Sequence, residues 1–561
     1  MNKTRLNIII LLILLVGAAV IGRLFSLQVL DRNFYKALAQ GQHKLFSDVS
    51  GERGEIFFSG GEKLATNQTT SFVYISPREV KDREKVKIVL SQIFDLKQDF
   101  LEEKLNKDSL YELIKDKITD PQIEKLERLK LEGIYIGEKR VRSYPQAGLA
   151  SQTIGFIDSE NQGQYGLEAF WQETLEGKGG TLEEERGASG LLISFSLPQE
   201  IKKGSDLILT LDYQVQFEAE RLLNKAKEDL KIDSGTIIVI KPDSGEIIAL
   251  ANYPNFDPNS YEQEKSLGIF QNSAIQKIFE PGSVFKPFTM ASAIQEQKIT
   301  PQTTYVDEGV VYIGKIPIYN YANRSYGQKT MTEVLEKSIN TGAVWAYQQL
   351  GSELFLKYLN KFGFFEKTNI DLQAEVFSQN QEFKKGYEIN FATASFGQGI
   401  EITPIQLVRA YCAIANGGRL VKPYLVKKII NEDGSVKETL PEISRNIISQ
   451  ETSSKVALMM TNVIENGFSK KAKIPGYFIA GKTGTAQVSW GALNIDKSGY
   501  SDKTIQSFIG FAPSFNPQFL ILVKLDNPEA KTAEYSALPV FRDLAKYIID
   551  LWQIPPDYEA E

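Results

Sequence analysis

The sequence predicts an α+β protein in which an antiparallel sheet flanked by helices follows a mixed α/β N-terminal region. Strand-like runs, TIIVI and EIIALAN, stand early in the C-terminal part, and two more, IQSFIGFA and FLILVKL, stand near its end. Helical patterns fill the segment between these pairs, which indicates a sheet closed by its first and last strands. An apolar run near the N-terminus adds one expected transmembrane helix.

The amino-acid composition excludes several kinds of site. The 561 residues suffice for a few domains of roughly 100–200 residues each. The 64 basic and 70 acidic side chains give a net charge of −6 without a basic block, which argues against nucleic acid as the main partner. One histidine, His43, and one cysteine, Cys412, exclude a multi-histidine zinc site, an intrachain disulfide and a CxxC pair. We expect a solvated or paired His43, a Cys412 in the core, no metal and no cofactor.

The N-terminal apolar run predicts a membrane anchor. Residues 7–22 are uncharged and nearly all apolar. At 1.5 Å per residue they span about 24 Å, which is short of the roughly 30 Å hydrocarbon core. Leu24–Leu30 supplies the missing length if the Arg23 side chain reaches the membrane interface. We therefore expect a cytoplasmic stub over 1–6 and a single transmembrane anchor over 7–30.

A cleaved signal peptide is the alternative interpretation of this run. Val16-Gly17-Ala18 resembles a small-residue cleavage site, but apolar residues continue beyond it. A short stub before one span indicates that the bulk of the chain is exported. The expected location is the plasma (inner) membrane, with the main part of the protein extracytoplasmic or periplasmic.

Residues 31–206 form a mixed α/β region. Strand-like runs at GEIFF, at 71–76 and at 133–145 flank a Lys- and Glu-rich stretch over 79–131. Apolar positions such as Ile88 recur there at helical spacing, which predicts amphipathic helices.

Residues 207–561 form the second region, and its local signals are clearer. They are a helix over Val215–Leu230, a hairpin turn at Lys241–Gly245, a capping box at Thr330 and Glu333, a helix that starts at Thr403-Pro404 and stops at Gly417, and a last helix over Leu538–Trp552.

Three short motifs stand in order in this second region. They are Ser283-Val284-Phe285-Lys286, Ser338-Ile339-Asn340 and Lys482-Thr483-Gly484. Each one alone is weak, because a chain of this length contains SxxK and SxN about once or twice by chance. The ordered set of three, each in a fitting local context, makes coincidence a poor explanation.

The first motif can make a nucleophile. Ser283 and Lys286 are three residues apart and share one helix face. Pro281-Gly282 breaks the chain just before, which places Ser283 in the first helical turn, where the helix dipole lowers the pKa of a lysine. In the absence of a suitable histidine, a desolvated lysine can activate the serine. The plain alternative is a surface serine beside a solvated lysine.

The other two motifs fit a substrate site. Ser338 and Asn340 fall between two predicted helices, where a hydroxyl can relay a proton and an amide can orient a substrate; the alternative is a helix-ending turn. Lys482 and Thr483 lie in a predicted strand, and a cation with hydroxyls suits a carboxylate. Gly484 lacks a side chain where a peptide could lie along the strand edge.

The three motifs together resemble those of the penicillin-binding proteins and serine β-lactamases. The surrounding text is similar to that of the monofunctional class B penicillin-binding proteins at 280–287, 395–399 and 481–487, and at Arg53-Gly54-x-Ile56, Arg142-x-Tyr144-Pro145 and Gly166-Leu-Glu168. Phe58-Ser59 departs from the family, which usually has Asp-Arg there. The resemblance implies a penicillin-binding/serine β-lactamase-like transpeptidase domain over 207–561 on a dimerisation-type pedestal over 31–206.

The family mechanism, carried to these positions, implies a serine D,D-transpeptidase of peptidoglycan. Ser283 would attack the penultimate D-Ala carbonyl of a stem pentapeptide, with Lys286 as the base, and a side-chain amine of a second strand would then take the acyl group. Ser338 would pass the proton and Lys482 would keep the site electropositive. The implied substrate contacts are Asn340 for the amide, Thr483 and Thr485 for the terminal carboxylate, Gly484 at the strand edge, and the backbone N–H groups of Ser283 and Thr485 for the oxyanion. β-Lactams would acylate Ser283.

The resemblance also implies partners. No acidic glycosyltransferase motif occurs in residues 31–210, so glycan polymerisation would come from a SEDS-type lipid II polymerase, among other divisome or elongasome membrane proteins. Glu280 and the Ser-x-Asn form are closer to the division (septal) type than to the elongation type. Two alternatives stay open: a D,D-carboxypeptidase or β-lactamase-type hydrolase on the same fold, and a non-catalytic β-lactam sensor or scaffold.

Overall fold

A computed structural model describes residue 17 and residues 44–186, 192–196, 202–493, 495–497 and 499–559. The predicted anchor and His43 lie outside the described residues. Within the described part, no helix has the length and apolar character needed to cross a membrane. The chain divides into two compact units, residues 1–54 with 176–205, and residues 55–175 with 206–561.

The first unit contains an antiparallel sheet of order β1-β8-β9, formed by Lys44–Gly51, Gly177–Arg186 and Leu192–Ser196. Its register shifts at one end, where Gly51 pairs with Gly177. A Cβ at Gly51 would lie 2.5 Å from the Gly177 carbonyl carbon, so only glycine permits this close approach of the two backbones.

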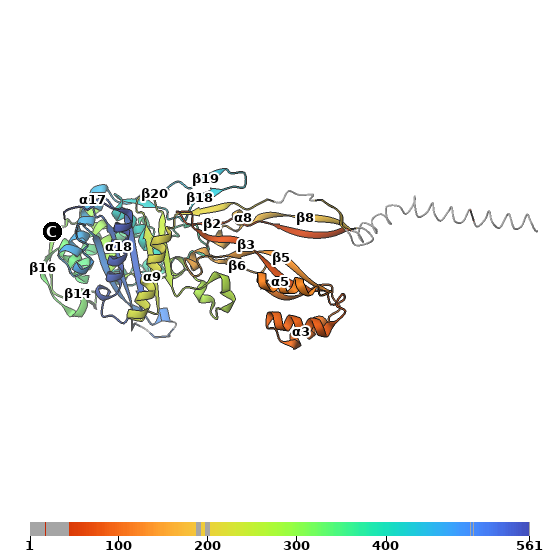
Figure 1. The fold of residues 1–561 in the computed structure, drawn as a ribbon. Helices are drawn as coiled ribbons and strands as arrows, with labels where there is room; N and C mark the ends of the chain where they lie inside the picture. The colour runs from red at the N-terminus through yellow and green to blue at the C-terminus, as the bar shows by residue number, and fades with distance from the viewer. Residues whose placement is uncertain are drawn as a thin grey trace, which may run out of the picture. The chain divides into compact units, whose positions relative to one another are not determined.

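The second unit contains an antiparallel sheet of order β12-β11-β23-β22-β21 (Figure 1). Its strands are β11 (Ser234–Ile240), β12 (Ile247–Tyr253), β21 (Ala480–Ser489), β22 (Tyr500–Ala512) and β23 (Phe519–Asp526). β11 pairs with β23, which confirms the predicted sheet closed by its first and last strands. β11 and β12 form the predicted hairpin.

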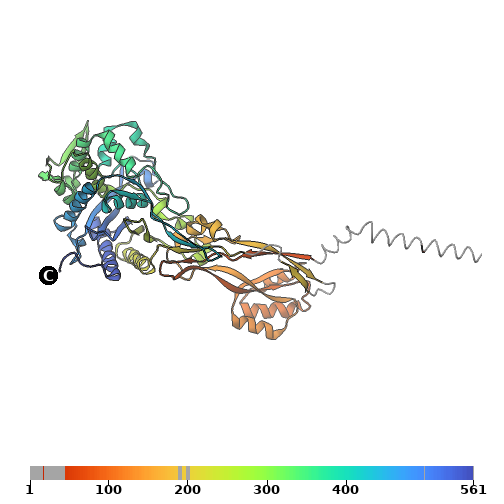
Figure 2. The same cartoon turned by 90° about the horizontal axis from the view of Figure 1, so that it is seen from above.

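Helices cover both faces of this sheet because its strands are apolar on both sides. Ile237 and Val239 of β11 pack in one buried cluster with α9 (Tyr213–Leu230) and α18 (Ala537–Trp552), the two helices that lie side by side in Figure 2. Ile238 and Ile240 point to the other face, against α16 (Pro404–Ala415). This period of two places alternate residues in two different cores.

Helix boundaries in this region follow the sequence signals. Thr403 accepts a hydrogen bond from the Gln406 amide and starts α16, which ends just before Gly417, whose φ is +83°. Thr330 and Glu333 form the predicted capping box of α12 (Met331–Glu336). α9 and α18 occupy the two other predicted helical ranges to within a few residues.

A second sheet contains strands from both halves of the sequence. Its order is β19-β18-β10-β2-β3-β4, with β5 also paired to β3. The strands are β2 (Ile56–Phe57), β3 (Lys63–Ile75), β4 (Glu112–Ile118), β5 (Ile134–Ser143), β10 (Asp206–Leu209), β18 (Val426–Ile430) and β19 (Val436–Glu438). β10 lies between β2 and β18, so Ile56, Leu207 and Leu425 share one core with the helices of the C-terminal region.

The predicted amphipathic helices of residues 79–131 are α3 (Arg83–Phe94), α4 (Gln98–Leu105) and α5 (Asp120–Leu129). They pack on β3, β4 and β5 around a separate small core (Figure 2). The buried face of α3 consists of Val86, Leu90 and Phe94, whereas Ile88 is 46% exposed. The predicted helix is present, and its buried stripe follows the i, i+4, i+8 spacing from Val86, which leaves Ile88 on the other side.

Two N-terminal sequence motifs meet in space. Arg142 Nε donates to Glu168 Oε1 at 2.8 Å, and the Tyr144 hydroxyl donates to the same oxygen at 3.3 Å. Glu168 is fully buried, and a buried carboxylate requires such donors. The Arg142-x-Tyr144 and Gly166-Leu-Glu168 motifs therefore have a structural role in fastening this region.

The remaining helices and strands lie between these elements along the chain. They are α6 (Ser151–Ile154), β6 (Phe156–Ile157), β7 (Gly163–Gln164), α7 (Gly166–Phe170), α8 (Gln172–Leu175), α10 (Ser273–Gln276), α11 (Lys286–Gln295), β13 (Thr304–Asp307), β14 (Val310–Ile313), β15 (Ile316–Tyr319), β16 (Gly327–Thr330), α13 (Asn340–Leu350), α14 (Ser352–Lys361), α15 (Glu388–Ala394), β17 (Arg419–Val421), β20 (Ile443–Asn446) and α17 (Gln450–Glu465).

Candidate active site

The segment that carries Ser283 is a tight turn in front of a helix. Gly282–Phe285 form a 3₁₀ turn, and the α-helix α11 begins at Lys286. Ser283 thus lies in the first helical turn, as predicted, and this turn has 3₁₀ geometry because the chain tightens at the helix start. Gly282 has φ +62°, and its amide donates to the Gly397 carbonyl at 2.9 Å. The Ser-Phe-Gly-Gln-Gly segment at 395–399 thus holds the turn.

Four of the predicted site residues form one cluster. Lys286 Nζ lies 3.0 Å from Ser283 Oγ, 3.2 Å from Ser338 Oγ and 2.6 Å from the Ser338 carbonyl oxygen. Lys482 Nζ lies 2.9 Å from the same Ser338 Oγ and 3.1 Å from the Thr483 carbonyl oxygen. A continuous chain of hydrogen-bonding atoms therefore runs from Ser283 through Lys286 and Ser338 to Lys482.

Lys286 is buried, and none of the carboxylates that the structure describes pairs with it. Its exposed fraction is 0%. Burial lowers the pKa of the Lys286 ammonium well below its ordinary value, and the positive charge of Lys482 lowers that pKa further. The direction and the role of desolvation are the predicted ones, and the like charge of Lys482 is a further cause. A neutral amine beside Ser283 Oγ is suited to accept its proton.

Lys482 is buried too, with 1% of its surface exposed. Burial lowers the pKa of its ammonium to about 7. Lys482 lies in β21, opposite Ile509 of β22, which confirms the predicted strand. Its charge therefore changes within the neutral pH range.

Ser338 and Asn340 lie where α12 ends and α13 begins. Ser338 adopts φ +54°, a left-handed conformation that costs a residue with a Cβ about 1 kcal/mol or more. This conformation turns both its hydroxyl and its carbonyl toward Lys286. Asn340 Nδ2 donates to the Tyr319 carbonyl at 3.0 Å, so the side chain is held at the edge of the cluster.

The side chains of Thr483 and Thr485 alternate with that of Lys482 along β21. Neither hydroxyl is hydrogen-bonded to the described residues of the cluster, and Thr483 contacts it only through its carbonyl, which accepts from Lys482 Nζ. Thr485 is exposed, and its Oγ1 accepts a hydrogen bond from the Ala533 amide at 3.4 Å. Its backbone nevertheless lies against the Ser283 turn: a Cβ at Gly282 would lie 3.3 Å from the Thr485 carbonyl oxygen.

Gly484 has a different physical role from the predicted one. A Cβ at this position would lie 2.5 Å from Ser507 Oγ, 2.9 Å from Val284 Cγ1 and 3.0 Å from the Pro281 carbonyl oxygen. The missing side chain thus lets β21 pack against the turn that carries Ser283. The sequence predicts instead that the missing side chain of Gly484 leaves room for a peptide along the strand edge.

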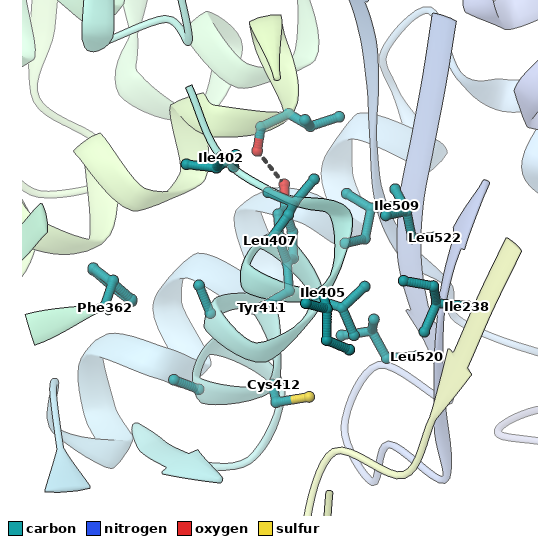
Figure 3. Close-up of a cluster of buried hydrophobic side chains, with 14 of the residues drawn as sticks. Ile238, Phe362, Ile402, Ile405, Leu407, Tyr411, Cys412, Ile509, Leu520 and Leu522 are labelled. Atoms are coloured by element: carbon teal, nitrogen blue, oxygen red, sulfur yellow. Dashed lines mark hydrogen bonds between the residues drawn. The ribbon is translucent and has the colours of Figure 1, made fainter. Parts of the chain in front are cut away.

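Sequence reasoning missed the residues that support these motifs. The hydroxyl of Tyr411 in α16 donates to the carbonyl of Val284, the residue after Ser283, and Figure 3 shows this hydrogen bond as a dashed line. Tyr411 and Val284 are 127 positions apart, and no local pattern marks the pair. Cys412, next to Tyr411, is fully buried among Ile405 and Leu520, as predicted for a core residue.

Two family models match the chain and together cover most of it. The penicillin-binding protein transpeptidase domain matches residues 235–546, and the penicillin-binding protein dimerisation domain matches residues 48–209.

Known proteins match across both regions. The stage V sporulation protein D of Bacillus subtilis is 33% identical over 491 residues, covering 85% of this chain and 74% of that protein. A peptidoglycan D,D-transpeptidase FtsI homolog of Mesostigma viride is 29% identical over 572 residues, covering 96% and 94%. The crystal structure of penicillin-binding protein 3 of Mycobacterium tuberculosis with aztreonam has a TM-score of 0.71 and 25% identity, covering 92% of this chain and 99% of that one. The chain therefore belongs to the class B penicillin-binding proteins, with a transpeptidase domain of the α+β type on an N-terminal dimerisation pedestal.

Proposed function

We propose that Ser283, Lys286, Ser338 and Lys482 carry out the D,D-transpeptidase reaction of this penicillin-binding protein, and that β-lactams acylate Ser283. The observation that carries the proposal is the position of the buried Lys286 amine, 3.0 Å from Ser283 Oγ and without a carboxylate partner. The substrates are the stem peptides of peptidoglycan, a donor that ends in D-Ala-D-Ala and an acceptor amine.

Acylation begins with proton transfer from Ser283 to Lys286. The Ser338 carbonyl can only accept a hydrogen bond, so it fixes one N–H of the neutral amine and leaves the lone pair for the Ser283 proton. Ser283 Oγ then bonds to the carbonyl carbon of the penultimate D-Ala. The C–N bond to the terminal D-Ala breaks after its nitrogen receives a proton by way of Ser338, which lies between the two lysines.

The remaining predicted residues bind the substrate in this proposal. The backbone N–H groups of Ser283 and Thr485 stabilise the oxyanion, and the close packing of Thr485 on Gly282 supports their proximity. Protonated Lys482 provides the positive field, and Thr483 and Thr485 hydrogen-bond the terminal carboxylate. Asn340 holds the donor amide through its Oδ1, because its Nδ2 is bonded to the Tyr319 carbonyl. Gly484 keeps β21 close enough to the Ser283 turn for these contacts.

The second half of the reaction transfers the acyl group. The amine of a second stem peptide attacks the ester carbon and gives a proton to the neutral Lys286, which passes it to Ser283 Oγ as the bond between that oxygen and the ester carbon breaks. A hydrolase would use water here, activated by a carboxylate near the ester. Glu280, three residues before Ser283, instead accepts a hydrogen bond from the Tyr500 hydroxyl at 3.0 Å. Because this carboxylate is already engaged, the arrangement favours transfer to an amine over hydrolysis.

The cellular setting belongs to the same proposal. A stub over 1–6 and an anchor over 7–30 hold the protein in the plasma membrane, and the pedestal over 31–206 presents the transpeptidase domain over 207–561 outside the cytoplasm. The apolar character of residues 7–22 supports the anchor. A SEDS-type polymerase supplies the glycan strands, and the Glu280 and Ser-x-Asn forms favour a septal role.

A labelling experiment with a matched serine control tests the proposed reaction. Separate samples of purified wild type, Ser283→Ala and Ser292→Ala are incubated either with a fluorescent penicillin or with a D-Ala-D-Ala pentapeptide and an amine acceptor. Ser292 is a buried serine on α11 that bonds the Phe288 carbonyl. We expect label and cross-linked product in wild type and Ser292→Ala, and neither in Ser283→Ala. Release of tetrapeptide without cross-linked product would identify a hydrolase instead.

A further inference from the structure

The start of α13 is capped by a side chain from a distant segment. The residue before the helix, Ile339, is fully buried and its side chain cannot accept a hydrogen bond. Asn320 Oδ1 takes this role, accepting from the Asn340 amide at 3.0 Å and the Thr341 amide at 3.1 Å. These N–H groups have no partner within the helix, so a remote acceptor satisfies them.

Asn320 is itself held by a buried carboxylate. Asn320 Nδ2 donates to Asp307 Oδ1 and Oδ2 at 3.0 and 2.9 Å. Asp307 also accepts from the Thr341 hydroxyl at 2.6 Å and from the amides of Gly309 and Tyr326. Asp307 and Asn320 are only 2% and 4% exposed. The network is thus shielded from solvent, and several hydrogen-bond donors hold the one carboxylate in a fixed position.

The same segment holds Asn340 from two sides. The Tyr319 carbonyl accepts from the Asn340 side chain, while the next residue, Asn320, accepts from the Asn340 backbone amide. A shift of Asn320 would therefore move the Asn340 backbone and, at the same time, change the orientation of the Asn340 side chain. Ser338 lies two residues earlier, across the rigidly buried Ile339.

We propose that Asp307 and Asn320 are positioning residues for the Ser338-Ile-Asn340 motif, and that they determine how well the site accepts a donor with an amide next to the reacting carbonyl. The proposal rests on the proposed function, in which Asn340 binds that amide. Asp307 and Asn320 touch no substrate; they act through the start of α13. A 1 Å displacement of a substrate-binding group costs roughly 100-fold in rate, so a rigid cap has a large effect.

A purely structural role predicts a different result, and two probes separate the two roles. Benzylpenicillin carries an acylamido group beside the β-lactam carbonyl, which Asn340 would bind, whereas imipenem carries a hydroxyethyl group there and lacks that amide. In Asn320→Ala, we expect acylation by benzylpenicillin to fall about 10- to 100-fold and acylation by imipenem to fall less than about 3-fold. A loss of folded protein would lower both rates equally.

A carboxylate far from the motif provides the matched control. Asp371 is partly buried and accepts from the Leu425 and Val426 amides at 2.7 and 2.8 Å, much as Asp307 accepts from backbone amides. Asp371→Asn should lower Tm as much as Asp307→Asn. Only Asp307→Asn should change the ratio of the benzylpenicillin and imipenem rates, both measured at 25 °C well below Tm.

A residue exchange tests whether the two positions act as a pair. Asn320→Asp keeps the acceptor for α13 but places two carboxylates in a buried contact, so we expect slow acylation by benzylpenicillin. The double variant Asp307→Asn/Asn320→Asp restores one donor and one acceptor. Its acylation by benzylpenicillin should be at least 10-fold faster than that of Asn320→Asp. No recovery would overturn the pairing.

The outcomes also separate this inference from the proposed function. If mass spectrometry finds no β-lactam on Ser283 of the wild type, the proposed function fails. The positioning role is wrong if Ser283 is acylated and Asn320→Ala reacts like wild type. It is also wrong if Asn320→Ala lowers the acylation rates by both β-lactams equally. A selective loss of the benzylpenicillin rate supports it.

Discussion

Lys482 Nζ lies 2.9 Å from Ser338 Oγ, and this hydrogen bond joins the edge strand β21 to the loop between α12 and α13. The same hydroxyl lies 3.2 Å from Lys286 Nζ, so one serine connects two buried lysines. Burial lowers the pKa of Lys286, and the like charge of Lys482 lowers it further. The site thereby places a base of strongly lowered pKa next to a lysine whose own pKa is about 7.

The coupling of the two lysines predicts a pH effect. The pKa of Lys286 is lowered, so its amine is free to act at pH values where an ordinary lysine is protonated, and acylation should slow as pH falls through this pKa. Lys482→Gln removes a cause of that lowering and should raise the pKa of Lys286. The acid limb of the benzylpenicillin acylation rate, measured between pH 4.5 and 9, should then move to higher pH, with the maximum rate lowered about 10- to 100-fold. An acid limb that stays in place or moves to lower pH would contradict the coupling.

Gly484→Ala should loosen the contact between β21 and the Ser283 turn. Its Cβ would meet Val284 and the Pro281 carbonyl, whose movement shifts Ser283. We expect a loss of about 1–3 kcal/mol in the free energy of unfolding and a fall of about 10-fold or more in acylation rate. Gly491→Ala is the control, because a Cβ there meets nothing within 4 Å. Denaturant unfolding and penicillin labelling measure the two effects, and equal behaviour of both variants would refute the packing role.

Tyr411→Phe should remove the donor that satisfies the buried Val284 carbonyl. The expected loss in unfolding free energy is about 1–3 kcal/mol, with slower acylation because the turn at Ser283 is less well held. Tyr477→Phe removes a comparable hydrogen bond, from the Tyr477 hydroxyl to the Ile554 carbonyl, outside the cluster. That control should lose stability and keep its acylation rate. If Tyr411→Phe is acylated as fast per folded molecule as wild type, the hydrogen bond stabilises the fold but does not position the Ser283 turn.

Cys412 should be inert in the folded protein. Its thiol is fully buried, and burial raises the pKa of that thiol far above its usual range. A maleimide should therefore leave the native protein unmodified at pH 7.5 for minutes and modify one thiol in denaturant. Cys412→Ala controls for reaction at other groups. Rapid modification of the native protein would place this part of α16 at the surface and contradict the core in Figure 3.

Local signals in the sequence predicted much of this fold. The Lys241–Gly245 turn, the Thr330 capping box and the Thr403-Pro404 helix start act over a few residues, and the structure has each of them. The three motifs also predicted the cluster of Ser283, Lys286, Ser338 and Lys482, because chance is a poor explanation for all three motifs in this order.

The contacts that no local pattern encodes were missed. Asn320 caps a helix 20 residues later in the chain, and Tyr411 supports a turn 127 residues earlier. The partner of β10 is β18, more than 200 residues away, and strand order of this kind depends on the whole core. The effect of the Lys482 charge on the pKa of Lys286 was missed for the same reason, since no local pattern places the two lysines side by side.

Intact-protein mass spectrometry after exposure to benzylpenicillin, followed by peptide mapping, tests the central claim most directly. Wild type should gain one penicilloyl group, located on Ser283, while Ser283→Ala should gain none and Ser292→Ala should react as wild type. An adduct on another residue, or an equal adduct in Ser283→Ala, would contradict the assignment of Ser283 as the nucleophile.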